Sequence, residues 1–270
     1  MSRMEGEASD THHESRFSMD SWIKAWNDGH WGFHCLVVND LIMKYYDSLV
    51  EQRTDLRFFL PLCGKSLDMK WLADKGHHVV GIDCASRAAV DFFAENKIEY
   101  DVSEVKTIEN CSLYKSKDGK IEFYVCDYFA LTKDVIGEFD VIWDRGSLNS
   151  MPLDKSSQYV ELMKKFMKPG TKIMIEIFEC YKDDGEVIKG LCLLEDDIRR
   201  LYGNCSCEIL ETFKYADIAK NMAMTTEDEE TWKKEVEEEK KCDCHDQPED
   251  GSQEDYFKNM CGKVYLLKVK

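Results

Sequence analysis

The stretch that decides the fold is LRFFLPLCGKSLDMKWLADKGHHVVGID, which occupies residues 56–83. Its first apolar run, residues 56–62, predicts a buried strand that is interrupted just before Gly64. A helix follows and ends at Gly76, and residues 78–83 predict a second strand. A strand, a crossover helix and another strand make up the repeating unit of a parallel sheet. We therefore expect an α/β fold.

The same alternation continues on both sides of this stretch. Helices are predicted at residues 18–28, capped by Ser18, and at residues 36–50, with Val37, Leu41 and residues 43–45 as an apolar stripe. Downstream the pattern predicts a helix capped by Ser86, a hairpin of residues 111–114 and 121–126, strands at 139–144 and 171–178, helices at 156–167 and 195–202, and an antiparallel pair at 207–213 and 263–268. The expected fold is a Rossmann-like, doubly wound, mostly parallel sheet with an antiparallel closing strand.

Length and composition favour one globular domain. The chain has 270 residues, is 43% hydrophobic and 33% charged, and carries a net charge of −17. This charge argues against nucleic acid or an acidic membrane as a partner, and no apolar run approaches the roughly 20 residues of a membrane span. We expect residues 1–17 to be disordered, without a signal peptide, and residues 18–270 to form the domain.

One segment carries most of the negative charge. Residues 225–255 contain fourteen acidic residues against four lysines, a net charge of −10. The segment interrupts the closing antiparallel pair, so it predicts a solvated loop insertion at about residues 220–258. The acidity therefore says little about an active site.

The twelve cysteines favour a reducing compartment over a disulfide framework. Most of them lie in apolar, strand-like runs, so we expect buried thiols in a cytoplasmic protein. The soft ligands Cys242, Cys244 and His245 number three, and a structural zinc site needs four. Cys205 and Cys207 complete a set only if the acidic loop folds back, so we expect no metal.

Candidate binding residues follow the carboxyl ends of the predicted parallel strands, where such sheets bind ligands. They are the turn at residues 62–65, Asp83 at the end of the second strand, residues 126–128, and residues 144–146. An acid about 20 residues after a glycine turn suits ribose hydroxyls, but the G-x-G-x-x-G phosphate cradle is absent. The pattern favours S-adenosylmethionine over NAD(P), and another nucleotide remains an alternative.

Specific motifs then point to one family. The run FFLPLCGK at residues 58–65 and the run WDRG at residues 143–146 resemble the thiopurine S-methyltransferase family, as do the spaced aromatic residues of the opening, residues 22–34, and the closing YLL at residues 265–267. The similarity extends from about residue 18 to residue 213 and resumes near residue 261. It implies a class I methyltransferase fold, with an N-terminal helical arm over the cofactor S-adenosylmethionine.

The resemblance also implies roles for individual residues. The arm that contains Trp22, Trp26 and Phe33 shields the cofactor, and Phe33 faces the acceptor ring. Leu62 contacts the methionyl part and Asp83 the ribose hydroxyls, while the adenine lies against Asp127 and Tyr128. Arg145 contacts the cofactor near the transferred methyl and is the expected catalytic residue toward the acceptor.

Three positions depart from the family pattern. Asp83 stands where animal members carry Glu, and Asp127-Tyr128 replaces a Ser-Ile pair. Residues 180–190 replace a proline-rich piece that lines the acceptor pocket. The acceptor is therefore expected to be an aromatic, heterocyclic or other small thiol, without further identification.

Alternatives remain at this stage. Without the family resemblance, Arg145 is explained equally well as a surface salt-bridge partner of Asp144. Two alternatives concern the function of the whole chain. It is a catalytically idle family member that binds the cofactor or a partner, or it is a selenium or tellurium methyltransferase. No general base is named, because acidic thiols ionise on their own and a cation such as Arg145 favours the thiolate. We expect a cytoplasmic monomer.

Overall fold

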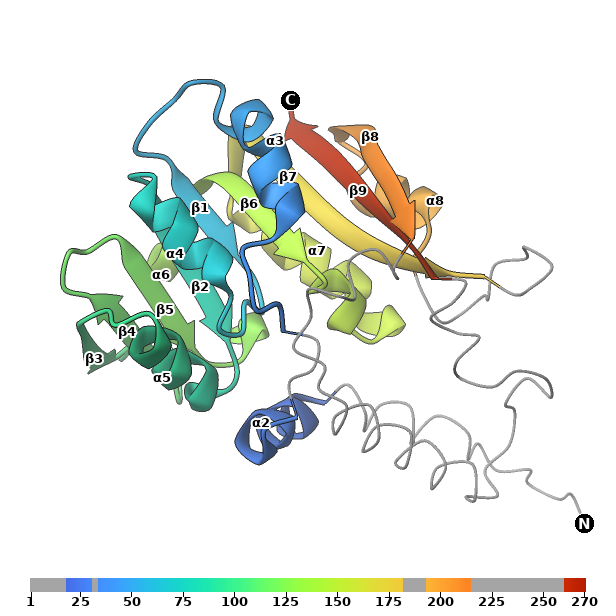
Figure 1. The fold of residues 1–270 in the computed structure, drawn as a ribbon. Coiled ribbons are helices and arrows are strands. Elements are labelled where there is room, and N and C mark those ends of the chain that lie inside the picture. Colours follow the sequence, from blue (N-terminus) through green and yellow to red (C-terminus); the bar gives the residue numbers. More distant parts are fainter. Residues whose placement is uncertain (1–17, 31–33, 182–192, 215–259) are drawn as a thin grey trace, which may run out of the picture.

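The computed structural model describes residues 18–30, 34–181, 193–214 and 260–270. The expected disordered start, Phe33 and the whole predicted acidic insertion therefore lie outside the described residues. In the part that is described, strands and helices alternate along the chain as the sequence predicts (Figure 1). The description below is confined to these residues.

The centre of the molecule is one mixed sheet. Its strands, within the described residues, follow the spatial order β3-β4-β5-β2-β1-β6-β7-β9-β8. Their bounds are β1 Arg57–Leu60, β2 His78–Asp83, β3 Tyr100–Glu104, β4 Ser112–Ser116, β5 Ile121–Val125, β6 Phe139–Arg145, β7 Met167–Cys180, β8 Cys205–Lys214 and β9 Met260–Val269.

The middle of the sheet is parallel and its two margins are antiparallel. Strands β5, β2, β1, β6 and β7 pair in parallel, whereas β9 runs antiparallel to β7 and β8 antiparallel to β9. The chain leaves β1 toward β2 and later returns to β6 on the other side of β1. This reversal is the switch point at which open α/β sheets bind ligands. The predicted doubly wound sheet with an antiparallel closing strand is confirmed.

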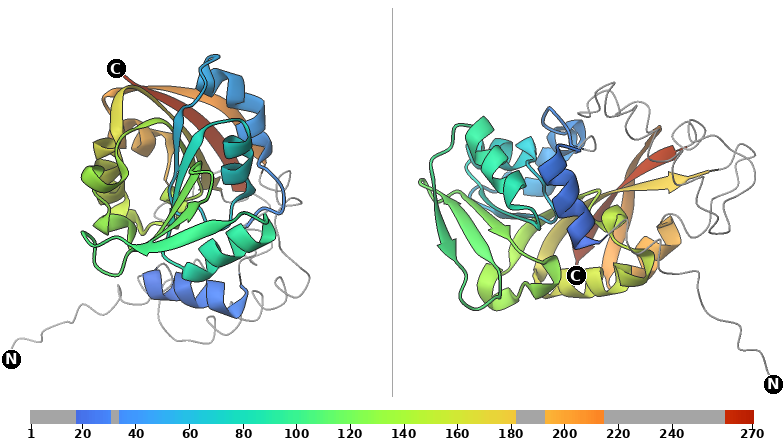
Figure 2. Two further views of the ribbon diagram at one scale, coloured as in Figure 1. Left: turned by 90° about the vertical axis from the view of Figure 1, so that its left-hand side faces the viewer. Right: turned by 90° about the horizontal axis from the view of Figure 1, so that it is seen from below.

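Helices cover both faces of this sheet (Figure 2). The longer ones are α2 Met19–Asp28, α3 Asp40–Val50, α4 Leu67–Asp74, α5 Ser86–Glu95, α7 Ser156–Lys165 and α8 Glu195–Leu201, with the short α6 at Lys133–Ile136. Buried side chains of α3, α4 and α5 belong to one apolar cluster, and those of α6, α7 and α8 belong to the other. The result is a three-layer α/β/α sandwich.

Alternation along the central strands fills both clusters. In β1, Phe58 packs in the cluster beneath α3 to α5, and Phe59 packs in the cluster beneath α7 and α8. Both rings are fully buried. Strands that are covered on both faces are apolar throughout, which explains why the sequence shows continuous apolar runs there.

Several predicted boundaries are wrong, and local hydrogen bonding explains them. Helix α3 begins at Asp40 and not at residue 36, because the Asn39 side chain caps it by accepting a hydrogen bond from the Leu41 N–H at 2.8 Å. Val37 and Met43 of the expected apolar stripe are consequently exposed. The N-cap of α5 is Ala85, so the predicted Ser86 cap is also wrong.

Two further differences concern strands. Strand β3 was not predicted, because its sequence YDVSE is largely exposed and lacks an apolar run. Helix α7 ends at Lys165, and β7 already begins at Met167, where it pairs with Phe139 of β6. None of the described helices is both long and apolar enough to cross a membrane.

Candidate functional site

The end of β2 and the turn after β1 are tied together by one carboxylate. Asp83 is 6% exposed, and its Oδ2 accepts a hydrogen bond from the Gly64 N–H at 2.9 Å. Its Oδ1 accepts a second bond from the Ala85 N–H at 3.0 Å. Burial raises the pKa of the Asp83 carboxyl, and these two bonds oppose that effect. Asp83 therefore fixes the position of the turn that approaches it.

The turn itself has an unusual backbone. Leu62 and Gly64 both adopt left-handed conformations, with φ of 42° and 51°. A bulky residue such as leucine seldom does so, and such strain is found at ligand-binding turns. The Cys63 N–H donates to the Ile82 carbonyl at 2.8 Å, which holds this strained turn beside the end of β2.

The helical arm α2 lies against this turn. Ser18 caps the helix and Gly29 ends it in a left-handed conformation, as the sequence predicts. Trp26 is only 3% exposed, and its indole packs on Gly64 so closely that a Cβ there would lie 2.8 Å from Cζ2. At the other end of the arm, the Met19 carbonyl lies 4.0 Å from the Cys84 Sγ. The arm thus runs across the carboxyl ends of β1 and β2 (Figure 1).

The other predicted residue of the arm, Trp22, is half-buried on α2. It lies one helical turn before Trp26 and so on the same side of the arm. Phe33, which follows the arm, lies outside the described residues, so its predicted contact with the acceptor stays a prediction.

Of the two residues predicted to contact the adenine, Asp127 lies at the surface and the Tyr128 side chain lies in the core. Asp127 is exposed and its Oδ1 accepts from the Phe129 N–H at 2.9 Å. Tyr128 is 3% exposed, its ring is stacked on Tyr159 with centroids 4.6 Å apart, and its hydroxyl donates to the Tyr159 carbonyl at 3.2 Å. The structure therefore brings Asp127 to the sheet edge and places the Tyr128 side chain inside the core.

Arg145 is the last residue of β6. Its partner is not Asp144, the residue next to it in the chain. Asp144 is fully buried, with Oδ1 accepting from the Ser147 and Leu148 N–H groups and Oδ2 accepting from the Tyr159 hydroxyl at 2.8 Å. Arg145 contacts Glu176 of β7, with Nε 3.7 Å from Oε2. The alternative of a surface salt bridge between Asp144 and Arg145 is thus wrong, because successive residues of a strand point to opposite faces.

Around Arg145 lie residues that sequence reasoning missed. The Arg145 Nη2 donates to the Cys35 Sγ at 3.0 Å. Asp68 is 3% exposed and accepts from the Trp143 Nε1–H at 2.7 Å and from the Asn39 N–H at 2.8 Å. We call Cys35, Asp68, Arg145 and Glu176 the arginine cluster. One signal for it was present: Glu176 is a charged residue within an apolar strand run, a place where charges are rarely buried without a partner.

His34 borders the arginine cluster. It is 7% exposed, and burial lowers its pKa to about 4, with the charges of Lys65 and Arg145 adding to the effect. The imidazole is therefore neutral at neutral pH and adds no charge to the site.

These residues are compatible with S-adenosylmethionine. The buried Asp83 carboxylate, held by the Gly64 and Ala85 N–H groups, is the kind of hydrogen-bond acceptor that ribose hydroxyls require. The glycine turn lets the backbone come close to a ligand without a phosphate cradle. An aromatic arm over the turn supplies the apolar surface that a sulfonium nucleoside requires.

The chain matches the thiopurine S-methyltransferase family over residues 17–240. This covers well over half of its length. The chain belongs to the thiopurine S-methyltransferase family. It is 36% identical to a probable thiopurine S-methyltransferase of Danio rerio over 198 residues, which cover 72% of this chain and 84% of the relative. It is 32% identical to the thiopurine S-methyltransferase of Bos taurus over 195 residues, 72% of this chain and 79% of that one.

Solved structures agree with the family's fold. The phosphoethanolamine N-methyltransferase 2 of Haemonchus contortus superimposes with a TM-score of 0.53 at 13% identity, over 95% of this chain and 58% of that one. The 1,6-didemethyltoxoflavin-N1-methyltransferase of Burkholderia thailandensis gives 0.52 at 11% identity, over 99% and 94%. At such low identity these likenesses support the fold alone. As a member of its family, the chain is an S-adenosylmethionine-dependent thiol S-methyltransferase.

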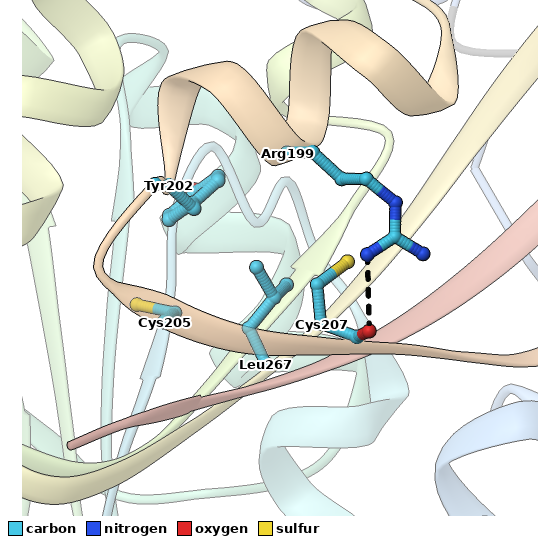
Figure 3. A pocket seen from close by; sticks show the side chains of 6 residues that line it. Arg199, Tyr202, Cys205, Cys207 and Leu267 are labelled. Atoms are coloured by element: carbon cyan, nitrogen blue, oxygen red, sulfur yellow. Dashed lines mark hydrogen bonds between the residues drawn. The ribbon is translucent and has the colours of Figure 1, made fainter.

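A separate hollow of about 180 Å³ lies between α8 and the closing strands (Figure 3). Cys205, Cys207 and Leu267 face Arg199 and Tyr202 across it, and the Arg199 Nη1 donates to the Cys207 carbonyl at 3.3 Å. It includes none of the predicted site residues. Within the described ranges no group of three or more His, Cys, Asp or Glu is arranged to hold a metal, and Cys242, Cys244 and His245 fall outside those ranges.

Proposed function

We propose that this chain transfers the methyl group of S-adenosylmethionine to the sulfur of a small, aromatic, heterocyclic or other thiol, with Arg145 at the acceptor. One observation carries the proposal. The Asp83 carboxylate, the strained turn at Leu62 and the arm residue Trp26 meet at the switch point, beside the strand that ends in Arg145. Such an arrangement gives the donor and the acceptor adjacent places.

On the cofactor side, each residue has a role that its position allows. Asp83 accepts the ribose hydroxyls, and the strained backbone at Leu62 lies against the methionyl part. Trp22 and Trp26 of α2 cover the cofactor from the solvent side. Asp127 accepts hydrogen bonds from the adenine amino group, whereas Tyr128 contributes backbone and not its ring, which stacks on Tyr159.

On the acceptor side, alignment and exclusion of water supply most of the rate. S-Adenosylmethionine supplies an activated methyl group, so no enzyme nucleophile is required. The acceptor sulfur forms the new carbon–sulfur bond with its own electron pair, and the old bond's pair stays with the donor sulfur. The proton of the acceptor thiol leaves to water. Arg145 orients an acceptor thiolate, and Phe33 packs on its ring.

We also infer that the protein works as a monomer in the cytoplasm. The cysteines whose side chains are described, among them the adjacent buried pair Cys111 and Cys126, are free thiols. Thiols persist in a reducing compartment. Sedimentation of the purified protein tests the oligomeric state, and localisation of a tagged chain tests the compartment.

A methyl-transfer assay over a panel of thiols, thiopurines and selenols tests the proposed function. We expect turnover of at least one small thiol, and cofactor binding that is weakened in Asp83→Ala. Cofactor-induced thermal stabilisation without turnover of any member of the panel would overturn the proposal in favour of a catalytically idle protein. Turnover of selenols alone would favour the selenium alternative.

A further inference from the structure

Tyr159 of α7 is a core residue on which two segments of the site converge. Its side chain is fully buried. Its ring is stacked on Tyr128 with the ring centroids 4.6 Å apart, and its carbonyl accepts a hydrogen bond from the Tyr128 hydroxyl at 3.2 Å. Its own hydroxyl donates to the Asp144 Oδ2 at 2.8 Å. One residue of a helix thus contacts both the segment that follows β5 and the last turn of β6.

The segment after β5 carries the residues predicted to lie against the adenine. It contains Asp127 and the short helix η1 Tyr128–Ala130. Asp127 bonds within this segment, with its Oδ1 accepting from the Phe129 N–H at 2.9 Å. The Tyr128 side chain anchors the segment in the core through its ring contact and hydrogen bond with Tyr159. The place of Asp127 at the sheet edge therefore depends on Tyr159.

The segment after β6 follows Arg145 and is shaped by Asp144. The Asp144 Oδ1 accepts hydrogen bonds from the Ser147 N–H at 3.1 Å and from the Leu148 N–H at 3.2 Å. One carboxylate thus holds the main chain on both sides of Arg145 and starts the short helix η2 Leu148–Ser150. Its other oxygen is bound by the Tyr159 hydroxyl, which fixes the carboxylate against α7.

The same segment reaches the strained turn after β1. The Ser147 hydroxyl donates to the Pro61 carbonyl at 2.6 Å, and the next residue, Leu62, has the left-handed φ of 42°. A continuous chain of hydrogen bonds therefore runs from Tyr159 through Asp144 and Ser147 to the turn on which the methionyl part is placed.

The Asp144 carboxylate needs these donors because it is fully buried. An ionised carboxyl without hydrogen bonds is costly at such a depth. The titratable side chains that act on it are phenols, Tyr128 of η1, Tyr159 of α7 and Tyr202 after α8, and burial raises the pKa of all three, so they are uncharged. Its ladder partner in β7, Ile175, is apolar. Hydrogen bonding, and not a neighbouring cation, therefore holds this charge.

We propose that Tyr159 is a positioning residue that braces the segment after β5 and the segment after β6 against each other, so that the adenine end and the methyl end of S-adenosylmethionine meet one rigid edge of the sheet. This inference rests on the proposed placement of the cofactor. Tyr159 acts from the core, through Tyr128 on one side and Asp144 on the other. Methyl transfer depends on close alignment, so loosening either segment lowers the rate as well as the affinity.

The bond between Tyr159 and Asp144 gives cofactor binding a defined dependence on pH. Burial raises the pKa of Asp144 to about 6, and the Tyr159 hydroxyl opposes that shift. Loss of the hydroxyl therefore raises this pKa further. A neutral carboxyl is a weaker acceptor for the Ser147 and Leu148 N–H groups, so the segment after β6 loosens as pH falls. Asp83, the other buried carboxyl at this edge, is present in both proteins and cancels in their comparison.

Tyr159→Phe tests the brace, because it removes the hydroxyl and keeps the ring. We expect the Kd for S-adenosylmethionine, measured by calorimetry, to rise about tenfold at about pH 6.5 and about threefold or less at about pH 8.5. The acid limb of binding should begin at higher pH than in the wild type. An unchanged Kd, or a loss that is the same at both pH values, would overturn the inference.

Tyr202→Phe is the matched control. Tyr202 is equally buried and also acts on Asp144, but within the described residues its hydroxyl makes no hydrogen bond. We expect its Kd and its acid limb to match those of the wild type. An equal loss of affinity in Tyr202→Phe would assign the effect to disturbed packing of the phenols and refute the proposal.

Two further comparisons keep the outcome decisive. If Tyr159→Phe does not fold, Tyr128→Phe removes the hydrogen bond to the Tyr159 carbonyl and should raise the Kd about threefold, and an unchanged Kd refutes the inference. If the wild type methylates no thiol, the proposed function fails, but these Kd values still decide about Tyr159. If Asp83→Ala and Tyr159→Phe both leave the Kd unchanged, the proposed placement of the cofactor fails. If Tyr159→Phe alone does so, the inference alone fails.

Discussion

Two buried carboxylates lie in the two halves of the proposed site, the cofactor half and the acceptor half, and they are held in different ways. Asp83 accepts backbone N–H groups at 2.9 and 3.0 Å, so its position follows from the path of the main chain at the ends of β1 and β2. Glu176 faces a side chain, the Arg145 guanidinium at 3.7 Å, across two strands that are distant in sequence. The cofactor half is therefore built from backbone, and the acceptor half from side chains.

This difference teaches which half is free to change. Replacing the Asp83 carboxylate by an uncharged side chain removes an acceptor of the Gly64 and Ala85 N–H groups in the turn. The side chains around Arg145 take no part in the backbone ladder between β6 and β7, so a change there leaves the ladder's own hydrogen-bonding groups in place. A family of this construction can keep one donor and vary its acceptors.

The largest effect on cofactor binding is expected from a substitution of Asp83. Asp83→Ala should weaken S-adenosylmethionine binding by about 1–3 kcal/mol, because a charged acceptor is lost and the Gly64 and Ala85 N–H groups lose their partner. Calorimetry measures the change, with Asp101→Ala, an exposed carboxyl beside Lys117, as the control. Unchanged affinity would remove Asp83 from the cofactor half.

Gly64 tests whether the arm belongs to that half. Gly64→Ala should lower cofactor affinity and stability by about 1–2 kcal/mol, because the new Cβ meets Trp26 at 2.8 Å and the left-handed φ of 51° is strained. Gly119→Ala is the matched control, with φ of 74° and nothing within 4 Å. Thermal melts with and without cofactor separate backbone strain, shared by both variants, from displacement of the arm. Equal effects in both would mean that Trp26 does not press on the turn.

Arg145 probes the acceptor half. Arg145→Leu should lower kcat/KM for anionic thiols by about tenfold and S-adenosylmethionine affinity much less, since the guanidinium acts on the acceptor charge. Neutral acceptors should lose less. The exposed Arg87, which bonds Asp91 on α5, supplies the control Arg87→Leu. Equal losses for anionic and neutral acceptors would leave Arg145 a purely structural partner of Glu176.

Stability against pH sharpens the assignment of Glu176. Its pKa of about 7 in the folded protein lies above the roughly 4.3 of an unfolded glutamate, so the folded state binds more protons between these values. Stability is accordingly lost as pH rises through this window. Glu176→Gln should therefore stabilise the protein by about 1 kcal/mol at high pH and not near the unfolded pKa. A gain of equal size at both ends of the window contradicts a titrating Glu176.

The smallest effect is expected from the acidic segment. Lys214 of β8 pairs with Cys261 of β9, so the described chain breaks off and resumes at neighbouring positions of the sheet. Replacing residues 225–255 by a short turn should change the melting temperature and cofactor affinity little, by well under about 1 kcal/mol. A collapse of either would show that a half of the site depends on that segment.

Much of the molecule was predictable from local sequence. Strand β2 has the predicted bounds, α2 has the predicted cap and end, and β4 and β5 form the hairpin that the sequence predicts there. The errors are local as well. The start of α3 was misplaced because the Asn39 cap outweighs the apolar residues before it, and β3 was missed because it has no buried face.

The sequence by itself determined the fold and the family, and it predicted a cofactor half of the site. Apolar periodicity specifies strands and helices, parallel strands place their carboxyl ends together, and residues 62–65 and Asp83 lie at those ends. Only the tertiary structure decided that Arg145 faces Glu176 and Cys35 and that Asp144 bonds Tyr159. It also placed Trp26 on Gly64. These contacts join segments far apart in the chain, and their geometry is set by strand register and helix packing, which no local pattern encodes.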